Sequence, residues 1–442
     1  MNAVLEAPER EAAFTREPEG TWVSAFFEAA RRQSTGALKP LWVGINLDAL
    51  GQNAARISAR LGDTQLCAVL KGDAYGHGIE NVTASLLKHC SHFAVVDNYE
   101  AALLRRRVKD AVVLRLRPSP PAEVAEAIEL GLQVREAAGS LGKAQEIDRI
   151  ARHCGRVVDL HVSLDVSGLG RGGFPVHDRN SLVKELQQVV DLPGTRVASV
   201  GCHLRDVSRC APARAEDSTR QAVDYFTVLV RQLCEFIAIS GKRLPEVSLF
   251  SSAGSVAFAQ SRPVKALGLT SFDRIGNSLF GLRSSAEHFE RNTRQVMHVG
   301  THVCMVVRRP AGATVGYEHA YHVSEHGEEL ALLGAGWSSM SREYQGIGKV
   351  PRPAWVANLY GGAHPLVGRQ SMNVSVIRAI DDHGRRLQDG DFVWITTDAA
   401  PTGEYFQRAP SIAALSACMQ NCQQEYITTV LGSSSSARRF VF

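Results

Sequence analysis

Residues 65–78 read QLCAVLKGDAYGHG, an apolar run that ends on a lysine and continues into a turn with three glycines. The run has the length and composition of a buried strand, and Lys71 stands where such a strand would end. Burying an ammonium group without a partner is costly, so a lysine here, followed by Tyr75 and His77, suggests a residue kept for chemistry. A strand-end lysine that reaches into solvent is the other interpretation of this stretch. The rest of the chain has to decide between the two.

The composition of the chain excludes several classes of protein. A length of 442 residues favours two domains. A net charge of +4 is too small and too scattered to predict binding to nucleic acid, and no apolar run is long enough to span a bilayer, so no membrane partner is expected. The nine cysteines are an odd number without a CxxC pair, which argues against a zinc site and against a small disulfide scaffold, and no metal is expected. The segment MNAVLEAPEREAAF lacks the charged start and apolar core of a secretory signal, which favours the cytoplasm.

Outward from residue 65, apolar runs alternate with segments of helical periodicity. In residues 217–240, for example, Val223, Phe226 and Val230 fall on one helical face. Such alternation predicts an α/β fold with a parallel sheet. The runs are VGINL, LCAVL, FAVV, AVVLRL, LQV, VVDLHVSL, VASVGCHL, VSLF and SFDRIG. If VGINL (residues 43–47) belongs elsewhere, eight strands remain, which is the count of a closed (β/α)8 TIM-like barrel.

The sequence pattern changes near residue 290. Beyond it, β-branched runs are separated by Gly, Pro and Asp turns, with no long helical pattern between them. We therefore expect an N-terminal extension over 1–40, a barrel over 41–290 and a mostly β C-terminal domain over 291–442. Within the extension, WVSAFFEAARR (residues 22–32) has two interpretations: a short amphipathic helix that covers a partner, or an ordered arm.

Polar residues stand at the ends of successive predicted strands. Catalytic residues of βα barrels collect at this carboxyl-terminal face, whichever chemistry they carry. A single polar residue at a strand end means little, but a series along one rim is hard to attribute to chance. The residues concerned are Lys71, Tyr75, Arg171, His203, Ser252 and Arg274.

Seven motifs in one order resemble those of the alanine racemase family of pyridoxal 5'-phosphate enzymes. They are VLKGDAYGHG, DVSGLGRGG, GCHL, SSAGS, FDRIGNSLFG, VGY and VGRQSMN. The resemblance covers nearly everything from residue 41 onward. It implies a barrel followed by a β domain, an amino-acid racemase activity and a pyridoxal phosphate cofactor. It also answers the question raised by residues 65–78, because Lys71 would form the imine with the cofactor there and act as one of two catalytic bases.

The resemblance also implies roles for the other motif residues. Tyr75, Ser252, Gly276 and Asn277 would contact the cofactor phosphate. Arg274 would face the pyridine nitrogen and keep it unprotonated, since a guanidinium can only donate hydrogen bonds.

The second catalytic base implied by the resemblance is Tyr317, which would reach the site from the β domain of a partner subunit. His203 would couple it to Arg274. The protein is thus expected to be a homodimer with composite sites. Arg171 and Met372 would contact the amino-acid substrate.

Three departures from the family pattern bear on substrate choice. Ser163 stands where many members carry a carbamylated lysine, so Arg171 would need another anionic or dipolar partner, such as a bound chloride. The entrance loop reads Ser371, Met372, Asn373 in place of Cys-Met-Asp, and Trp337 replaces a tyrosine. These departures resemble the broad-spectrum racemase branch and predict a broad substrate range. A dedicated alanine racemase is the alternative.

Two rival functions and one cysteine pair remain open. GRGGFP (residues 170–175) mimics the phosphate loop of a fold-related amino-acid decarboxylase, but it follows the racemase order. A non-catalytic cofactor carrier would lack the β domain. Cys67 and Cys90 match a disulfide of periplasmic members; in a reducing compartment they would stay thiols.

Overall fold

The computed structural model describes residues 22–32, 40–205, 207, 215–259, 262–283, 292–340, 346–349, 354–397 and 437–441. The chain forms two compact units. One unit contains the described residues within 50–74 and 82–293, and the other contains those within 1–49, 75–81 and 294–442.

The first unit is built on a closed parallel barrel. Among the described residues, eight parallel strands follow one another in the order β2, β3, β4, β5, β6, β8, β9 and β10, and β10 pairs with β2. The Val247 N–H donates to the Thr270 carbonyl (2.9 Å) and the Arg274 N–H to the Phe250 carbonyl (2.9 Å), which joins β9 to β10. The strands are β2 (Gln65–Val69), β3 (His92–Val95), β4 (Val112–Arg115), β5 (Val134–Ala138), β6 (Val158–Asp165), β8 (Thr195–Gly201), β9 (Glu246–Ser248) and β10 (Phe272–Ile275); β7 (Phe174–Pro175) pairs with β6. The predicted TIM-like barrel is confirmed.

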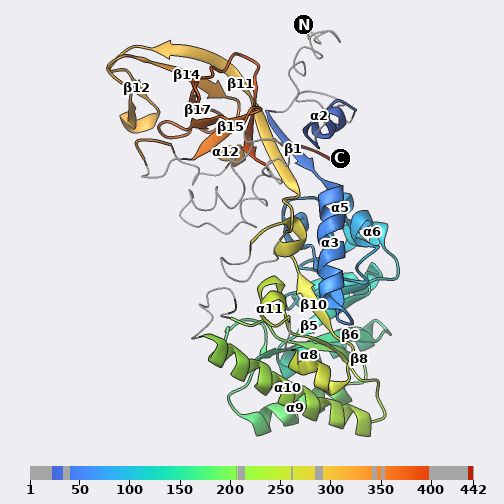
Figure 1. Ribbon diagram of the computed structural model, residues 1–442. Coiled ribbons are helices and arrows are strands. Elements are labelled where there is room, and N and C mark those ends of the chain that lie inside the picture. Colours follow the sequence, from blue (N-terminus) through green and yellow to red (C-terminus); the bar gives the residue numbers. More distant parts are fainter. Residues whose placement is uncertain are drawn as a thin grey trace. The chain divides into compact units, whose positions relative to one another are not determined.

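Helices cover the outside of the barrel (Figure 1): α8 packs beside β6 and β8, α9 beside β8, and α10 beside α9. Capping residues set where several of them begin: Ser140 accepts the Lys143 N–H ahead of α8, and Asp178 accepts the Asn180 N–H ahead of α9. The helices are α3 (Leu47–Leu61), α5 (Ile79–Leu86), α6 (Asn98–Arg107), α7 (Pro121–Glu129), α8 (Leu141–His153), α9 (Arg179–Asp191), α10 (Ala215–Ile239) and α11 (Ser252–Ala257), with 3-10 turns η1 (Pro263–Leu267) and η2 (Asn277–Phe280). The short segment α4 (Lys71–Tyr75) is a left-handed turn.

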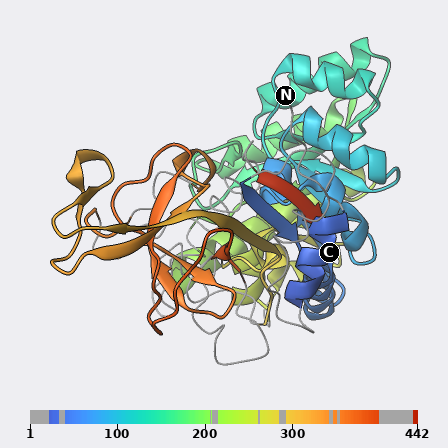
Figure 2. The ribbon, with the colours of Figure 1, turned by 90° about the horizontal axis from the view of Figure 1, so that it is seen from above.

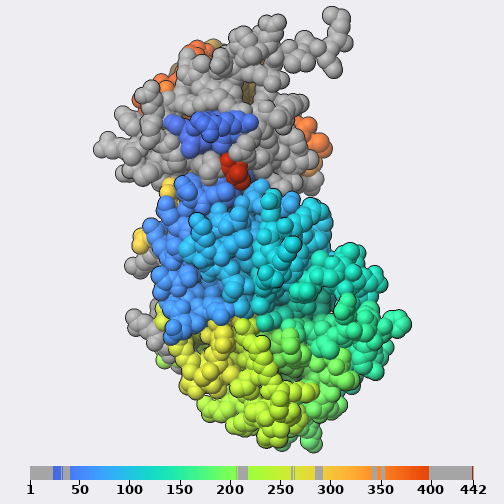
Figure 3. Space-filling model, turned by 90° about the vertical axis from the view of Figure 1, so that its right-hand side faces the viewer, coloured from blue at the N-terminus to red at the C-terminus, as the bar shows by residue number. Residues whose placement is uncertain are grey.

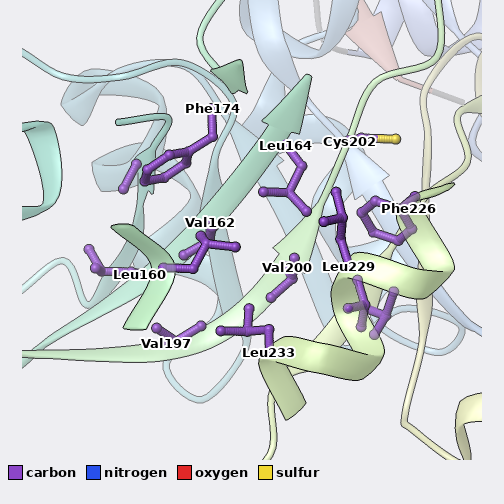
Figure 4. Packing of buried hydrophobic residues seen from close by; sticks show 14 of the residues in the cluster. Leu160, Val162, Leu164, Phe174, Val197, Val200, Cys202, Phe226, Leu229 and Leu233 are labelled. Carbon is purple, nitrogen blue, oxygen red and sulfur yellow. The ribbon is translucent and has the colours of Figure 1, made fainter. Parts of the chain in front are cut away.

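The apolar face predicted for α10 lies in the core. Figure 4 shows Phe226, Leu229 and Leu233 of this helix facing strand residues that include Val197 and Val200. Phe226 is fully buried and Leu229 is 1% exposed. Burying one such side chain contributes about 1.5–3 kcal/mol, so this face is enough to fix the helix on the barrel.

The second unit holds a mostly antiparallel sheet. The strand β1 (Leu41–Ile45) pairs antiparallel with the long strand β11 (Met297–Arg309) and parallel with β19 (Ala437–Val441), which lies beside it in Figure 2. The run VGINL therefore begins in this sheet and not in the barrel, which leaves the eight barrel strands expected. The other strands are β12 (Thr314–Val315), β13 (Tyr321–His322), β14 (Glu328–Leu333), β15 (Trp355–Asn358), β16 (Ala363–Pro365), β17 (Ser375–Arg378) and β18 (Phe392–Thr396), with the turn η3 (Tyr317–His319) and the helix α12 (Trp337–Met340). The mostly β character of the C-terminal segment is confirmed.

The helix α2 (Trp22–Arg32) covers an aromatic cluster of this same unit. Phe26 packs edge-on against Trp394, with ring centroids 4.8 Å apart, and Phe27 packs edge-on against Phe392 at 4.9 Å. Both phenylalanines are buried, at 0% and 2% exposure. In Figure 3 the outward face of α2 is seen in dark blue beside the red of β19. Residues 22–32 are thus an amphipathic helix whose apolar face is occupied by its own chain.

Candidate active site

Four predicted site residues gather at the carboxyl-terminal rim of the barrel. Lys71 lies two residues beyond the end of β2, whose hydrogen bonding to β3 continues through the Leu70 N–H to the Ala94 carbonyl (2.8 Å). Arg171 and His203 follow β6 and β8, and Arg274 lies in β10. Lys71, Arg171 and His203 are exposed to solvent. Their common rim follows from the parallel barrel, in which all strands end on the same side.

The electrostatics of His203 show that these residues interact. Loss of hydration where the ring packs against the protein lowers its pKa most. The positive charges of Arg274, Arg171 and Lys71 lower the pKa further, to about 4. A neutral ring is therefore the stable form of His203 near neutral pH. Such a ring accepts a hydrogen bond at one nitrogen and donates one at the other.

Arg274 is a buried cation held by uncharged groups. Its side chain is 7% exposed. Nη1 donates to the carbonyl and hydroxyl of Ser248, at 3.2 and 2.5 Å, and Nη2 donates to the Cys202 carbonyl at 2.5 Å. Among the described residues neither a carboxylate nor any acceptor for Nε–H is found, so this N–H is available to an acceptor such as a ring nitrogen. Burial lowers the pKa of this guanidinium, and no described group offsets that with an ion pair.

Three of the four predicted phosphate contacts, Ser252, Gly276 and Asn277, also lie together. The Ser252 hydroxyl, at the start of α11, accepts the N–H groups of Gly276 (3.3 Å) and Ser278 (3.4 Å). Ser252 and Gly276 are buried, and Asn277 is half-buried. Two backbone donors that converge on one oxygen at long distance suit an anionic oxygen. The residues present therefore fit a phosphate group here, as the Nε–H of Arg274 fits the ring of the same cofactor.

Three predicted residues belong to the other unit and are described within it. Tyr75 is buried, at 6% exposure, and has a positive φ of 55°. Tyr317 is 63% exposed and begins the turn η3. The next residue, Glu318, ties this turn to Lys349 (2.5 Å) and Arg369 (2.7 Å) through ion pairs. The third predicted residue, Met372, is 53% exposed.

Two of the three departures from the family pattern, Trp337 and the loop Ser371 to Asn373, meet in this unit, whereas Ser163 lies in β6 of the barrel. The N–H of Trp337 donates to the Ser371 carbonyl (3.0 Å), and the Ser338 hydroxyl donates to Asn373 Oδ1 (2.9 Å). Gly336 is required by this approach, because a Cβ there would lie 2.3 Å from the Ser371 carbonyl oxygen.

Two further expectations concern Arg171 and the cysteines. Arg171 is exposed, and within the described residues it forms no ion pair, so none of these residues is the anionic partner that the substitution at Ser163 led us to expect. Cys67 and Cys90 are buried thiols. Burial raises the pKa of both, that of Cys67 to about 12.

One residue beside this site was not predicted from the sequence. Glu100 follows β3 and bonds the backbone directly after Lys71, with Oε1 accepting the Gly72 N–H at 2.6 Å. The pattern Asp97-x-x-Glu100 is a sequence signal, but it is the usual signature of a helix start. Asp97 does cap α6 by accepting the Glu100 N–H at 2.9 Å, whereas the Glu100 carboxylate turns to the neighbouring strand end.

Two other features are absent from the part of the chain that the structure describes. Its His, Cys, Asp and Glu side chains form no group of three or more that could hold a metal ion. None of its helices is long and apolar enough to cross a membrane.

A closed βα barrel with a lysine-centred rim, joined to a second, antiparallel β unit, defines the class of protein. Residues 45–284 match the N-terminal domain of alanine racemase, and residues 296–435 match its C-terminal domain. The chain belongs to the alanine racemase family.

Curated relatives within this family carry several names. A "Broad specificity amino-acid racemase" of Aeromonas hydrophila is 28% identical over 359 residues, which is 80% of each chain. A "Lysine racemase" of Proteus mirabilis is 24% identical over 338 residues, which is 76% of each chain.

Solved structures share the fold. The alanine racemase of Streptomyces lavendulae superposes with a TM-score of 0.74 at 22% identity, covering 92% of this chain and 98% of that one. The enzyme of Bartonella henselae, solved with covalently bound pyridoxal phosphate, gives a TM-score of 0.72 at 18% identity, covering 92% of this chain and 100% of that one.

Proposed function

We propose that the protein is an amino-acid racemase that interconverts L- and D-amino acids of several kinds with pyridoxal 5'-phosphate as its cofactor. The observation that carries this proposal is the rim of the barrel. There Lys71, Arg171 and His203 follow the parallel strands β2, β6 and β8, and Arg274 lies in β10. Family membership and the names of the curated relatives support the same activity.

The cofactor would be held by the residues that the family resemblance implies. The Bartonella henselae enzyme binds pyridoxal phosphate covalently, and in this chain the amine of Lys71 would be the attachment point. The Ser252 hydroxyl, the Gly276 and Asn277 segment and the Tyr75 hydroxyl would bind its phosphate. Arg274 would donate Nε–H to the ring nitrogen. When bound, pyridoxal phosphate supplies an electron sink that makes the Cα proton of the amino acid acidic.

Proton transfer on the two faces of Cα would fall to two side chains. Lys71 Nζ would take or return the proton on one face, and the Tyr317 hydroxyl of a second chain would do so on the other. His203, neutral at working pH, would connect Tyr317 with Arg274. Arg171 is exposed without an ion pair among the described residues, so its guanidinium is available to the substrate carboxylate.

The substrate range would be broad because the entrance loop lacks a charge. Asn373 and Ser371 stand where family members with Cys-Met-Asp carry a carboxylate and a thiol, and Asn373 Oδ1 already accepts a hydrogen bond from Ser338. Met372 leaves a flexible, uncharged side chain exposed beside them. The names of the curated relatives fit this range, and a dedicated alanine racemase remains the alternative.

We also propose a homodimer with composite sites, a cytoplasmic location with the periplasm as the alternative, and a division into an extension (1–40), a barrel segment (41–290) and a β domain (291–442). The first strand of the barrel segment, β1, pairs within the sheet of the β domain. The dimer follows from the role given to Tyr317. Cys67 and Cys90, as thiols, suit a reducing compartment.

Replacement of Lys71 tests the function directly. Lys71→Ala should bind no pyridoxal phosphate covalently and should form no D-amino acid from any L-amino acid, because both the attachment point and one base are lost. Chiral chromatography and absorption spectroscopy measure the two effects. Lys88→Ala, which removes an exposed lysine elsewhere on the barrel unit, is the matched control. Racemisation by the Lys71→Ala chain would refute the proposal.

A further inference from the structure

The backbone directly after Lys71 makes a left-handed turn. Gly72, Asp73 and Ala74 have φ of 66°, 51° and 56° and ψ near the left-handed helical value. Glycine adopts this conformation freely, but residues with a Cβ lose roughly 1–2 kcal/mol each in it. Asp73 and Ala74 therefore need support from the surrounding structure.

That support comes from the Glu100 carboxylate in the first turn of α6. Its Oε1 accepts the N–H groups of Gly72 (2.6 Å) and Asp73 (3.2 Å), and its Oε2 accepts the N–H of Val96 (2.8 Å) at the end of β3. One side chain thus joins the backbone after β2 to the backbone after β3. The chain closes the turn further with the Ala74 N–H, which donates to the Leu70 carbonyl at 2.8 Å.

Burial of the Glu100 carboxylate costs free energy, and its hydrogen bonds go to the backbone of the turn and of the residue at the end of β3. The residue is 5% exposed, and within the described residues it forms no ion pair with a basic side chain. Burial raises the pKa of its carboxyl, although the backbone N–H donors of Val96, Asp73 and Gly72 oppose that effect. The helix start does not need it, since Asp97 already caps α6. What its removal would change is the conformation of the turn that begins at Lys71.

We propose that Glu100 is a positioning residue for Lys71: its carboxylate holds the left-handed turn and so fixes the direction in which Lys71 leaves the end of β2. The inference rests on the proposed function, in which Lys71 carries the cofactor. A fixed backbone would lower the entropy lost when the flexible lysine side chain is brought to one geometry.

The first experiment needs no cofactor. Hydrogen exchange of the Gly72 and Asp73 amides is measured in the full chain dialysed free of pyridoxal phosphate. These amides should be protected in the natural protein and should exchange at least tenfold faster in Glu100→Gln, because glutamine keeps the size but has one acceptor oxygen where glutamate has two. Unprotected amides in the natural protein would overturn the proposal, even if the variant failed to fold.

The second experiment measures attachment of the cofactor. Pyridoxal phosphate is added to the dialysed chain, the product is trapped with borohydride, and labelling of Lys71 is followed by mass spectrometry. Labelling of Glu100→Gln should be at least tenfold slower, and kcat should fall more than KM changes.

The matched control is Glu136→Gln, which alters a carboxylate of 2% exposure that binds Arg115 and Ser119 instead of the turn. Its amides at Gly72 and Asp73 and its labelling rate should match the natural protein. Equal slowing in both variants, or natural labelling in Glu100→Gln, would overturn the proposal. If the natural chain is not labelled at Lys71, the proposed function fails, while the exchange data still decide whether Glu100 holds the turn.

Discussion

Two backbone features set the position of Lys71, and the sequence pattern predicts only the first of them. The strand that precedes it is visible as an apolar run, and the structure has β2 end two residues before it. The left-handed turn that follows it depends on Glu100, which lies 29 residues further along the chain, and on hydrogen bonds between neighbouring strand ends. A reactive side chain is thus set by a local pattern on one side and by a tertiary contact on the other.

Replacement of Tyr317 tests its proposed role as the second catalytic base. Tyr317→Phe should keep the cofactor bound, but it should lose exchange of the α-proton from one enantiomer far more than from the other, because only one face of Cα depends on the tyrosine hydroxyl. Proton exchange in deuterated water, followed separately for each enantiomer, measures the asymmetry. Tyr360→Phe, a tyrosine of the same unit that is 50% exposed, is the control. Equal losses from both enantiomers would count against Tyr317 as a base.

At the scale of elements, the barrel was predictable because each of its strands is a short apolar run between turn residues. The strand or helix that each element packs against was harder to predict. The run VGINL looks like any buried strand, and nothing in its periodicity says that Leu41–Ile45 pairs with β11 and β19. The amphipathic pattern of residues 22–32 likewise predicts a helix without saying that Phe26 meets Trp394. Contacts between residues far apart in the sequence leave no local pattern.

The candidate site shows the same division. Lys71, His203 and Arg274 stand at strand ends and were predicted to share a rim, since parallel strands end on one side. The role of Glu100 was not predictable, because its spacing from Asp97 is that of a helix cap. The exposure of Arg171 was also not predictable, since it depends on how the loop after β6 folds.

The barrel strands carry a partly buried ion cluster that predicts a pH dependence of stability. Glu246 in β9 is hydrogen-bonded to His92 (3.3 Å) and to Arg135. Burial opposes its charge, but these hydrogen bonds and the charge of Arg135 outweigh burial and lower the pKa of Glu246 from 4.5 to about 2. A depressed carboxyl pKa stabilises the folded state above the unfolded pKa, and this stability is lost as the pH falls towards the folded pKa.

The measurement compares urea unfolding of the natural protein and of Glu246→Gln as the pH is lowered. The natural protein should be the more stable near neutral pH. Its advantage should shrink by about 3 kcal/mol between about pH 5 and about pH 2, because protonated glutamate then resembles glutamine. A difference in the free energy of unfolding that stays constant over this range would show that Glu246 is not held as the ion described.

At the scale of the whole molecule, the proposed two-base mechanism requires that a site be completed by a second chain. Lys71→Ala and Tyr317→Phe chains should each be inactive, yet after mixing and subunit exchange some heterodimers should contain one site with both natural residues. Racemase activity should therefore return in the mixture and not in either variant alone. Lack of recovery after exchange has been verified by mass spectrometry would place both bases in one chain.

The most direct test of the central claim is kcat/KM for formation of the D-enantiomer from L-lysine, L-arginine, L-methionine and L-alanine, measured by chiral chromatography with added pyridoxal phosphate. We predict turnover of the longer amino acids at values comparable with or above that of alanine, because the entrance loop carries Ser371 and Asn373. A preference for alanine of more than roughly a hundredfold, about 3 kcal/mol of discrimination, would contradict the broad range. Absence of any D-enantiomer would contradict the racemase itself.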